Sequence, residues 1–178
     1  AHIELGQLSG DDCRRWSNSM FTNNLRKLTA GQGNRNALAD LKGRLIAVAD
    51  VYLATAEPDR YVVVLEGSSF AWLFERLDRY IIMDDVELEP LAQHRVLSVQ
   101  GPNADAVVSA AGLPLPEQAL AELDGVYVLR RDRTGLGGLD LLVPVERLEA
   151  LWTALREAGA AAAGIEALEV LRVQAGKP

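Results

Sequence analysis

The sequence contains few of the residues on which most catalytic and metal-binding sites depend. It has a single cysteine, Cys13, and two histidines, His2 and His94, among 178 residues. One cysteine excludes an internal disulfide and a zinc site built from several thiolates. The histidines lack metal-ligand spacing, and neither a Ser/His/Asp order nor a dinucleotide-binding fingerprint occurs. We therefore expect no bound metal and no nucleophile based on cysteine or on a histidine-activated serine.

Basic residues are also in deficit. The chain has 18 Lys and Arg against 25 Asp and Glu, which gives a net charge of −7, and its pI is near 4.9. A surface that follows nucleic-acid phosphates needs clustered Lys and Arg, so this balance argues against such a partner. No apolar run reaches the ~18–20 residues that span a bilayer, and the first residues lack signal-peptide character. We expect a cytoplasmic protein without a nucleic-acid or membrane partner.

Apolar residues are abundant, at 49% of the chain, so a substantial core can form without disulfides. The clearest pattern is a pair of apolar runs at residues 37–39 and 45–52, joined by a turn. Asp40 opens this turn because its side chain can bond the backbone two residues on, and Gly43 closes it because glycine tolerates positive φ. A third run at residues 61–65 would flank the long strand. Since residues 45–49 are apolar on both faces, we expect this strand at the centre of a sheet, covered on each side.

The remaining patterns alternate between helices and strands. Helical spacing occurs at residues 11–20, 70–81, 102–112, 144–158 and 165–173, and strand-like runs at residues 3–8, 84–90, 94–100, 126–130 and 139–143. The last two strands would pair as a hairpin. In the helix at 144–158, the side chains expected to face inward are Leu148, Leu151, Trp152 and Leu155. This order predicts an α+β fold with mixed or antiparallel sheets, helices packed on them, and two related β-α-β-β-type subdomains, residues 1–90 and 91–178.

Two local motifs have alternative interpretations. The acidic strand at residues 84–90 could hold a metal through its carboxylates, but alternation favours a solvated edge strand. The connection at residues 132–138 is rich enough in glycine to suggest a phosphate-binding loop. Such a loop must be followed at once by a helix, whereas a strand follows here, so this interpretation is rejected.

Several motifs point to one known family. They are FTNNL at 21–25, LTAGQG at 28–33, LKGRL at 41–45, LSVQGP at 97–102, RTG with GLD at 133–140, and GIEALEVLRVQAG at 164–176. In this order they resemble the folate-binding domain of the glycine-cleavage T-protein superfamily. The resemblance implies the family's fold, with tetrahydrofolate in a central cavity between subdomains, and a chain that lacks the family's C-terminal part. Members include aminomethyltransferases, sarcosine and dimethylglycine demethylating enzymes, and YgfZ-type proteins that assist iron–sulfur proteins.

The chain departs from the transferase pattern at the reacting position. The family's transferases have an acidic residue shortly after the glycine of the central turn, whereas residues 44–48 contain no carboxylate and the next one is Asp50. An aliphatic side chain cannot stabilise a developing iminium or hold a proton. The acidic residue that contacts the pterin in the family's last segment is replaced by Gln174, which keeps hydrogen-bonding capacity but not charge. Leu136 replaces the glutamate of the Tyr-Thr-Gly-Glu pattern.

Three functions are therefore open. The first is a YgfZ-like tetrahydrofolate-binding accessory domain, related to iron–sulfur protein maintenance and without its own transferase activity. The second is an aminomethyltransferase that uses Asp50 or another carboxylate. For Asp50, the alternative is a structural role in its strand. The third is an interaction module that binds a protein partner and no longer binds folate.

The resemblance suggests four cofactor-binding residues. Tyr52 could present an aromatic face to a pterin ring while Gln174 bonds its edge in one shared pocket. Arg131 and Arg133, with neighbouring Arg130, form a basic cluster that could meet a folate glutamate tail or the acidic face of a partner. The alternatives are ordinary sheet packing for Tyr52, a solvent-facing helix end for Gln174, and a solvated hairpin rim for the arginines.

Overall fold

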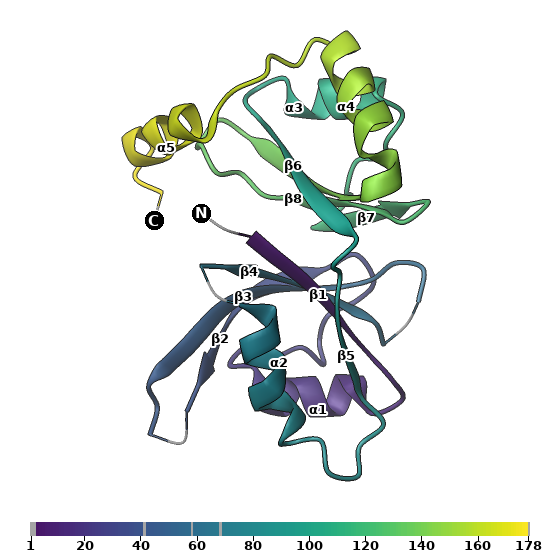
Figure 1. Cartoon of the computed structure of the whole chain (residues 1–178), viewed down its shortest axis with the longest axis vertical. Coiled ribbons are helices and arrows are strands. Elements are labelled where there is room, and N and C mark those ends of the chain that lie inside the picture. The colour runs from purple at the N-terminus through teal and green to yellow at the C-terminus, as the bar shows by residue number, and fades with distance from the viewer. Residues whose placement is uncertain (1–2, 41, 58, 68, 178) are drawn as a thin grey trace. The chain divides into compact units, whose positions relative to one another are not determined.

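The chain folds into two α+β units, residues 1–92 and 93–178, each built on one antiparallel sheet (Figure 1). The computed structural model describes residues 3–40, 42–57, 59–67 and 69–177. The predicted α+β class with antiparallel sheets is confirmed. None of the helices in these described ranges is both long and apolar enough to cross a membrane.

The described residues of unit 1 form five strands and two helices. In chain order they are β1 (Ile3–Ser9), α1 (Cys13–Met20), β2 (Gly33–Ala39), β3 (Leu45–Leu53), β4 (Tyr61–Glu66), α2 (Phe70–Asp78) and β5 (Glu87–Pro90). The strands lie in the order β2-β3-β4-β1-β5, and every neighbouring pair is antiparallel. The acidic strand β5 pairs only with β1 among the strands described, so the predicted edge position is confirmed.

The turn between β2 and β3 forms as its residue types predict. The Asp40 carboxylate accepts hydrogen bonds from the N–H groups of Lys42 at 2.8 Å and Arg44 at 2.9 Å. Gly43 has a φ of 77°, in the left-handed region that glycine tolerates best. Residue 41 of this turn lies outside the described residues. The Asp40 side chain thus stabilises the turn by replacing backbone partners that the hairpin leaves unpaired.

The prediction of a central strand at residues 44–55 is wrong in two respects. β3 does lie between two strands, but the middle strand of the five is β4. The first half of β3 is not buried on both faces either, because Ile46 and Val48 are only half-buried while Ala47 and Ala49, which point to the other face, are buried, and Leu45 is 64% exposed. Apolar side chains make up a large part of every protein surface, so an apolar run alone does not show burial on both sides.

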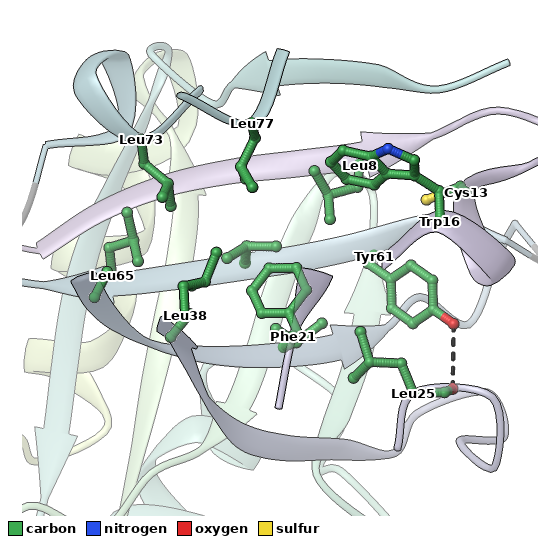
Figure 2. Packing of buried hydrophobic residues seen from close by; sticks show 14 of the residues in the cluster. Leu8, Cys13, Trp16, Phe21, Leu25, Leu38, Tyr61, Leu65, Leu73 and Leu77 are labelled. Carbon is green, nitrogen blue, oxygen red and sulfur yellow. Dashed lines mark hydrogen bonds between the residues drawn. The ribbon is translucent and has the colours of Figure 1, made fainter. Parts of the chain in front are cut away.

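The core of unit 1 lies between the sheet and its two helices. α1 contributes Cys13 and Trp16, and α2 contributes its buried stripe Phe70, Leu73 and Leu77. Figure 2 shows Leu73 and Leu77 in this core and, in another part of it, Cys13 and Trp16 near Tyr61 of β4. The Tyr61 hydroxyl donates to the Leu25 carbonyl at 3.3 Å. Burial raises the pKa of the buried Cys13 thiol to about 11, because the charged thiolate is unfavourable away from water.

Unit 2 has four strands, a short 3-10 helix and three α-helices. They are β6 (His94–Gln100), α3 (Ala104–Ala110), β7 (Leu120–Leu123), β8 (Val126–Arg130), β9 (Gly138–Pro144), η1 (Val145–Arg147), α4 (Leu148–Glu157) and α5 (Ile165–Gln174). The strand order is β6-β9-β8-β7. The β8–β9 hairpin is confirmed, whereas β7 was not predicted.

The helices of unit 2 differ in how much they bury. Leu151 and Leu155 of α4 lie in the core, as predicted, and Leu148 packs against it in part. Trp152 was expected to face inward, but it is 45% exposed, because Leu151 and Leu155 already occupy the side of α4 that faces the sheet. α5 has apolar residues on several sides and no buried residue. Its exposed apolar side chains include Val170 and Val173.

Candidate functional site

Two guanidinium groups meet one buried carboxylate in unit 2. Asp140 of β9 is 1% exposed, and Arg133 binds it with two nitrogens, Nη2 at 2.6 Å and Nε at 3.0 Å. Arg131 donates to the same carboxylate at 3.1 Å, and Ser98 of β6 donates its hydroxyl at 2.7 Å. Asp140, Arg131, Arg133, Ser98 and Gln100 are called the arginine–aspartate cluster below. A buried carboxylate requires such partners because an unpaired buried charge is strongly unfavourable.

Gln100 holds the arginine loop against β6. Its side-chain amide donates to Ser98 Oγ at 2.9 Å and to the Arg131 carbonyl at 3.0 Å, and its side-chain oxygen accepts from the Arg133 N–H at 2.9 Å. Gly138 pairs with Gln100 across the two strands. A Cβ at Gly138 would clash with the Gln100 amide, so the absence of a side chain there makes room for this network.

The loop after β8 turns on Asp132. Its carboxylate accepts from the N–H groups of Thr134 at 3.0 Å and Gly135 at 2.7 Å, and Lys177 lies 3.3 Å away. Burial by itself would raise the pKa of Asp132, but the two N–H donors and Lys177 outweigh it and lower that pKa. The ion pair with Lys177 connects this loop to the segment that follows α5.

The arginines therefore have different roles. Arg130 is 41% exposed and pairs with Asp105 on the surface, which agrees with the solvated-rim interpretation. That interpretation is wrong for Arg131 and Arg133, whose side chains are only 10% and 14% exposed and bind Asp140. The sequence contained one signal for this cluster, a carboxylate inside the otherwise apolar run at 139–143. Sequence reasoning did not identify Asp140, Ser98 or Gln100.

A groove of about 500 Å³ lies in unit 2 beside the cluster. One side is formed by β6 and the turn that follows it, and the other by the connection between α4 and α5 together with α5 itself. Ser98 and Gln100 line the groove as well as belonging to the cluster, and Thr134 also reaches it. The volume lies within the ~300–1,000 Å³ that ligand pockets usually have.

The other candidate residues are not members of the cluster. Tyr52 is buried in β3, and it pairs across the sheet with Gly33, where a Cβ would clash with the tyrosine ring. Gln174 is the exposed last residue of α5. Because Tyr52 belongs to unit 1 and Gln174 to unit 2, a pocket shared by the two stays a prediction. Asp50 lies on β3, opposite Arg35 of β2.

The described part of the chain contains no group of three or more His, Cys, Asp or Glu side chains arranged to hold a metal ion. The chemistry available at the cluster is instead hydrogen bonding and charge. The network consists of two guanidinium groups, one carboxylate and the polar side chains of Ser98 and Gln100. Such connected networks hold their members in fixed positions.

Comparison with known proteins identifies relatives along the whole chain. The family model of the GCVT N-terminal domain matches residues 2–178. The aminomethyltransferase of Stenotrophomonas maltophilia is 29% identical over 192 residues, covering 99% of this chain and 51% of the relative. The aminomethyltransferase of Pseudomonas syringae pv. tomato is 28% identical over 188 residues, with the same coverage of 99% and 51%. The chain thus spans about half the length of these curated relatives.

One solved structure has the same fold. The crystal structure of the glycine cleavage system aminomethyltransferase T from Bartonella henselae superposes with a TM-score of 0.85 and 22% sequence identity. The match covers 98% of this chain and 49% of that chain.

Proposed function

Because the chain belongs to the GCVT N-terminal domain family, we propose that it is the tetrahydrofolate-binding domain of an aminomethyltransferase-like protein. The observation that carries this proposal is the family match over residues 2–178, which includes every motif of the resemblance. The relatives that bear the name aminomethyltransferase support the same assignment. Within the chain, Tyr52, Arg131, Arg133 and Gln174 are the proposed folate contacts.

A second function is favoured by one specific feature, the lack of a carboxylate at residues 44–48. In this alternative the domain binds folate as a YgfZ-like accessory protein for iron–sulfur protein maintenance and transfers no aminomethyl group. Asp50 is the nearest acidic residue in β3, and it lies opposite a cation, Arg35, in the strand register. That placement supports a structural role for Asp50, since opposite charges across a strand pair are mutually stabilising.

Isothermal titration with tetrahydrofolate and with folinic acid tests folate binding. Binding should release or absorb heat and raise the unfolding temperature, because a ligand that binds only the folded form stabilises it. The absence of both effects at millimolar ligand would overturn the proposal. Gln174→Ala should weaken binding without loss of stability, since Gln174 is exposed and the described residues offer it no hydrogen-bond partner. Gln118→Ala, at another exposed glutamine of unit 2, is the matched control.

Arginine variants need a separate stability measurement. Arg133→Ala removes two bonds from the buried Asp140, so lost folate binding could follow from misfolding alone. The informative comparison is Arg131→Lys, which keeps a cation near Asp140 but loses the planar guanidinium. We expect Arg131→Lys to stay folded, by circular dichroism, and to bind folate less tightly than the wild type does.

A glycine-cleavage assay with the lipoyl carrier protein separates the two functions. Aminomethyl transfer predicts turnover that Asp50→Asn abolishes while tetrahydrofolate binding is retained. The accessory function predicts that the wild type and the Asp50→Asn variant both bind folate and that neither shows turnover. Turnover that survives Asp50→Asn would exclude Asp50 as the catalytic carboxylate.

A further inference from the structure

β6 is an edge strand with one side open. It pairs with β9 over its whole length, from His94 opposite Pro144 to Gln100 opposite Gly138. No described strand pairs with its other side. The His94 carbonyl on that side accepts a hydrogen bond from the Arg95 side chain at 2.8 Å. Within residues 96–100, the backbone N–H and C=O groups that point to the open side can pair with an added strand, as exposed sheet edges do in strand-addition complexes.

The groove of unit 2 runs along this open side. Five consecutive residues of β6, residues 96–100, line it. Because successive side chains point to opposite faces of a sheet, a cavity that touches all five must face the backbone edge rather than one face. A second hollow shares Leu97 and Trp152 with the groove and continues it toward Val145. Together the two hollows follow residues 96–100 of β6.

The opposite side of the groove is lined by apolar side chains, several of them small. It consists of the connection at residues 159–164, which includes four successive alanines, and of Ile165, Leu168 and Leu171 on α5. Figure 1 shows this connection as an extended segment between α4 and α5. Five residues of an extended chain span ~16 Å, so the lined part of β6 accommodates a short strand.

We propose that this groove binds an extended peptide segment of a partner protein, which adds to β6 as a further strand of the unit 2 sheet. The connection at residues 159–164 and α5 line the same groove as β6, so a bound peptide would lie between them and the strand.

Charge specifies the peptide further. Arg156 is the one charged residue among those that line the groove, and its Nη1 donates to the Ala160 carbonyl at 2.6 Å, which holds it at the groove. No carboxylate of the described residues lies within salt-bridge distance of Arg156, although the chain carries a net charge of −7. The peptide therefore carries a carboxylate that meets Arg156. Its apolar side chains pack on Leu97 and Trp152.

Fluorescence anisotropy with labelled peptides tests the inference. The probes are short peptides of alternating valine and threonine, with one aspartate placed at each position in turn. We expect saturable binding that depends on the aspartate position. Arg156→Glu should weaken the best peptide about tenfold or more, since it replaces attraction by repulsion. Arg79→Glu, at the exposed arginine that follows α2, is the charge control and should leave binding unchanged.

A filled groove provides the second test. Ala162 is exposed and lines the groove, so Ala162→Trp should block it without disturbing the core. Binding should be lost, whereas Ala150→Trp, at an exposed alanine of α4 outside the groove, should bind as the wild type does. Hydrogen exchange should show β6 amides that become protected only when peptide is present.

Three results would overturn the proposal. The first is that none of the peptides binds at millimolar concentration. The second is equal binding by the best peptide and a version with proline at alternate positions, which lacks the N–H groups a strand must donate. The third is a dimer in sedimentation that Ala162→Trp converts to a monomer, because the occupant would then be a second copy of the chain.

Discussion

Unit 1 and unit 2 share one topology. The strands run β2-β3-β4-β1 in the first and β7-β8-β9-β6 in the second, and in each unit a helix follows the first strand and another follows the fourth. Unit 1 adds the edge strand β5, whereas unit 2 adds the helix α5. The two units can therefore be compared position by position along β4 and β9.

The comparison matches an apolar residue with a charged one. In the β3–β4 hairpin of unit 1, the residue pair next to the connecting loop is Leu53 with Tyr61. In the β8–β9 hairpin of unit 2, the corresponding pair is Arg130 with Leu139. Tyr61 and Leu139 both belong to the cores beneath their helices. The next residues along the strands are Val62 and Asp140, which are buried and belong to neither core cluster. The same position thus holds a valine in unit 1 and an aspartate in unit 2.

The difference shows what the arginine–aspartate cluster contributes. Since unit 1 buries this position with valine, the topology itself does not require a charge there. A buried ion pair seldom stabilises a protein more than apolar packing of the same volume does. The cluster instead fixes the position of the loop after β8, because Gln100 and Asp140 together bind both arginines of that loop. We infer that the role of Asp140 is to hold the loop after β8 in position and not to stabilise the sheet.

The largest predicted effect comes from removing the carboxylate alone. Asp140→Ala leaves two guanidinium groups without their shared partner, so we expect the free energy of unfolding to fall by ~3–5 kcal/mol. Urea denaturation measures this loss. Val62→Ala at the matched position of unit 1 removes only apolar contacts and should cost ~2 kcal/mol.

Converting unit 2 to the apolar arrangement of unit 1 is the control. The triple variant Asp140→Val, Arg131→Met and Arg133→Met removes all three charges, and its stability should return close to that of the wild type. A single Asp140→Ala variant as stable as the wild type would show that the arginines find other partners, and the comparison would then fail.

The second prediction concerns glycines that lie beside a larger cross-strand neighbour. Gly138→Ala would displace the Gln100 amide from its three hydrogen bonds, and we expect a loss of ~1–3 kcal/mol in unfolding free energy. In unit 1, Gly33→Ala should act similarly through the ring of Tyr52. A double-mutant cycle checks the cause, because Gly138→Ala should cost less in a Gln100→Ala background. Equal costs in both backgrounds would exclude the clash with Gln100.

Most of the fold was predictable because one face of each strand or helix is buried, so apolar residues recur in the sequence at strand or helix spacing. β6 was predicted with its observed bounds, and so was the partnership of β8 and β9. β7 was missed because Leu120–Leu123 contains no β-branched residue, and this short strand forms through its pairing with β8. The partner strand β8 begins at Val126, directly after a short turn, and its pairing outweighs the weak strand preference of β7 itself.

The candidate site was predictable only in part. The sequence marks Arg131 and Arg133 as a basic pair, but their partner lies on the following strand. The ion pairs depend on the hairpin register, which places Asp140 opposite Leu129 and beside Ser98. A one-residue shift in register would turn Asp140 to the other face of the sheet. Register comes from packing and turn geometry together, so composition alone did not distinguish a buried cluster from a solvated rim.

The third prediction compares the aspartate turns of the two units under acid. The N–H of Arg44 lowers the pKa of Asp40, and the donors around Asp132 lower its pKa despite partial burial. A carboxyl whose pKa is lower in the folded state stabilises the protein above its unfolded pKa, near 3.8. That contribution is lost as the pH falls through the lower folded pKa. Asp40→Asn and Asp132→Asn keep an oxygen acceptor but cannot titrate.

Unfolding midpoints measured from about pH 6 to about pH 2 check this. Each asparagine variant should lose less stability on acidification than the wild type does, and the double variant should lose least. Surface glutamates provide the control, and Glu149→Gln on α4 should leave the acid dependence nearly unchanged. An acid dependence identical in all variants would show that these turns do not contribute.

The smallest predicted effect separates Arg130 from its two neighbours. Arg130 is 41% exposed and its partner Asp105 is 48% exposed, so water screens the pair and the long side chain loses entropy when it is held. Arg130→Ala should therefore change the free energy of unfolding by only ~0–1 kcal/mol, and less at high salt. Arg133→Ala should cost several times more, because Asp140 is buried and would lose its bidentate partner. Urea denaturation of both variants at low and high salt measures the contrast. If Arg130→Ala were as costly as Arg133→Ala, exposure would not be what separates a rim arginine from a cluster arginine in this hairpin.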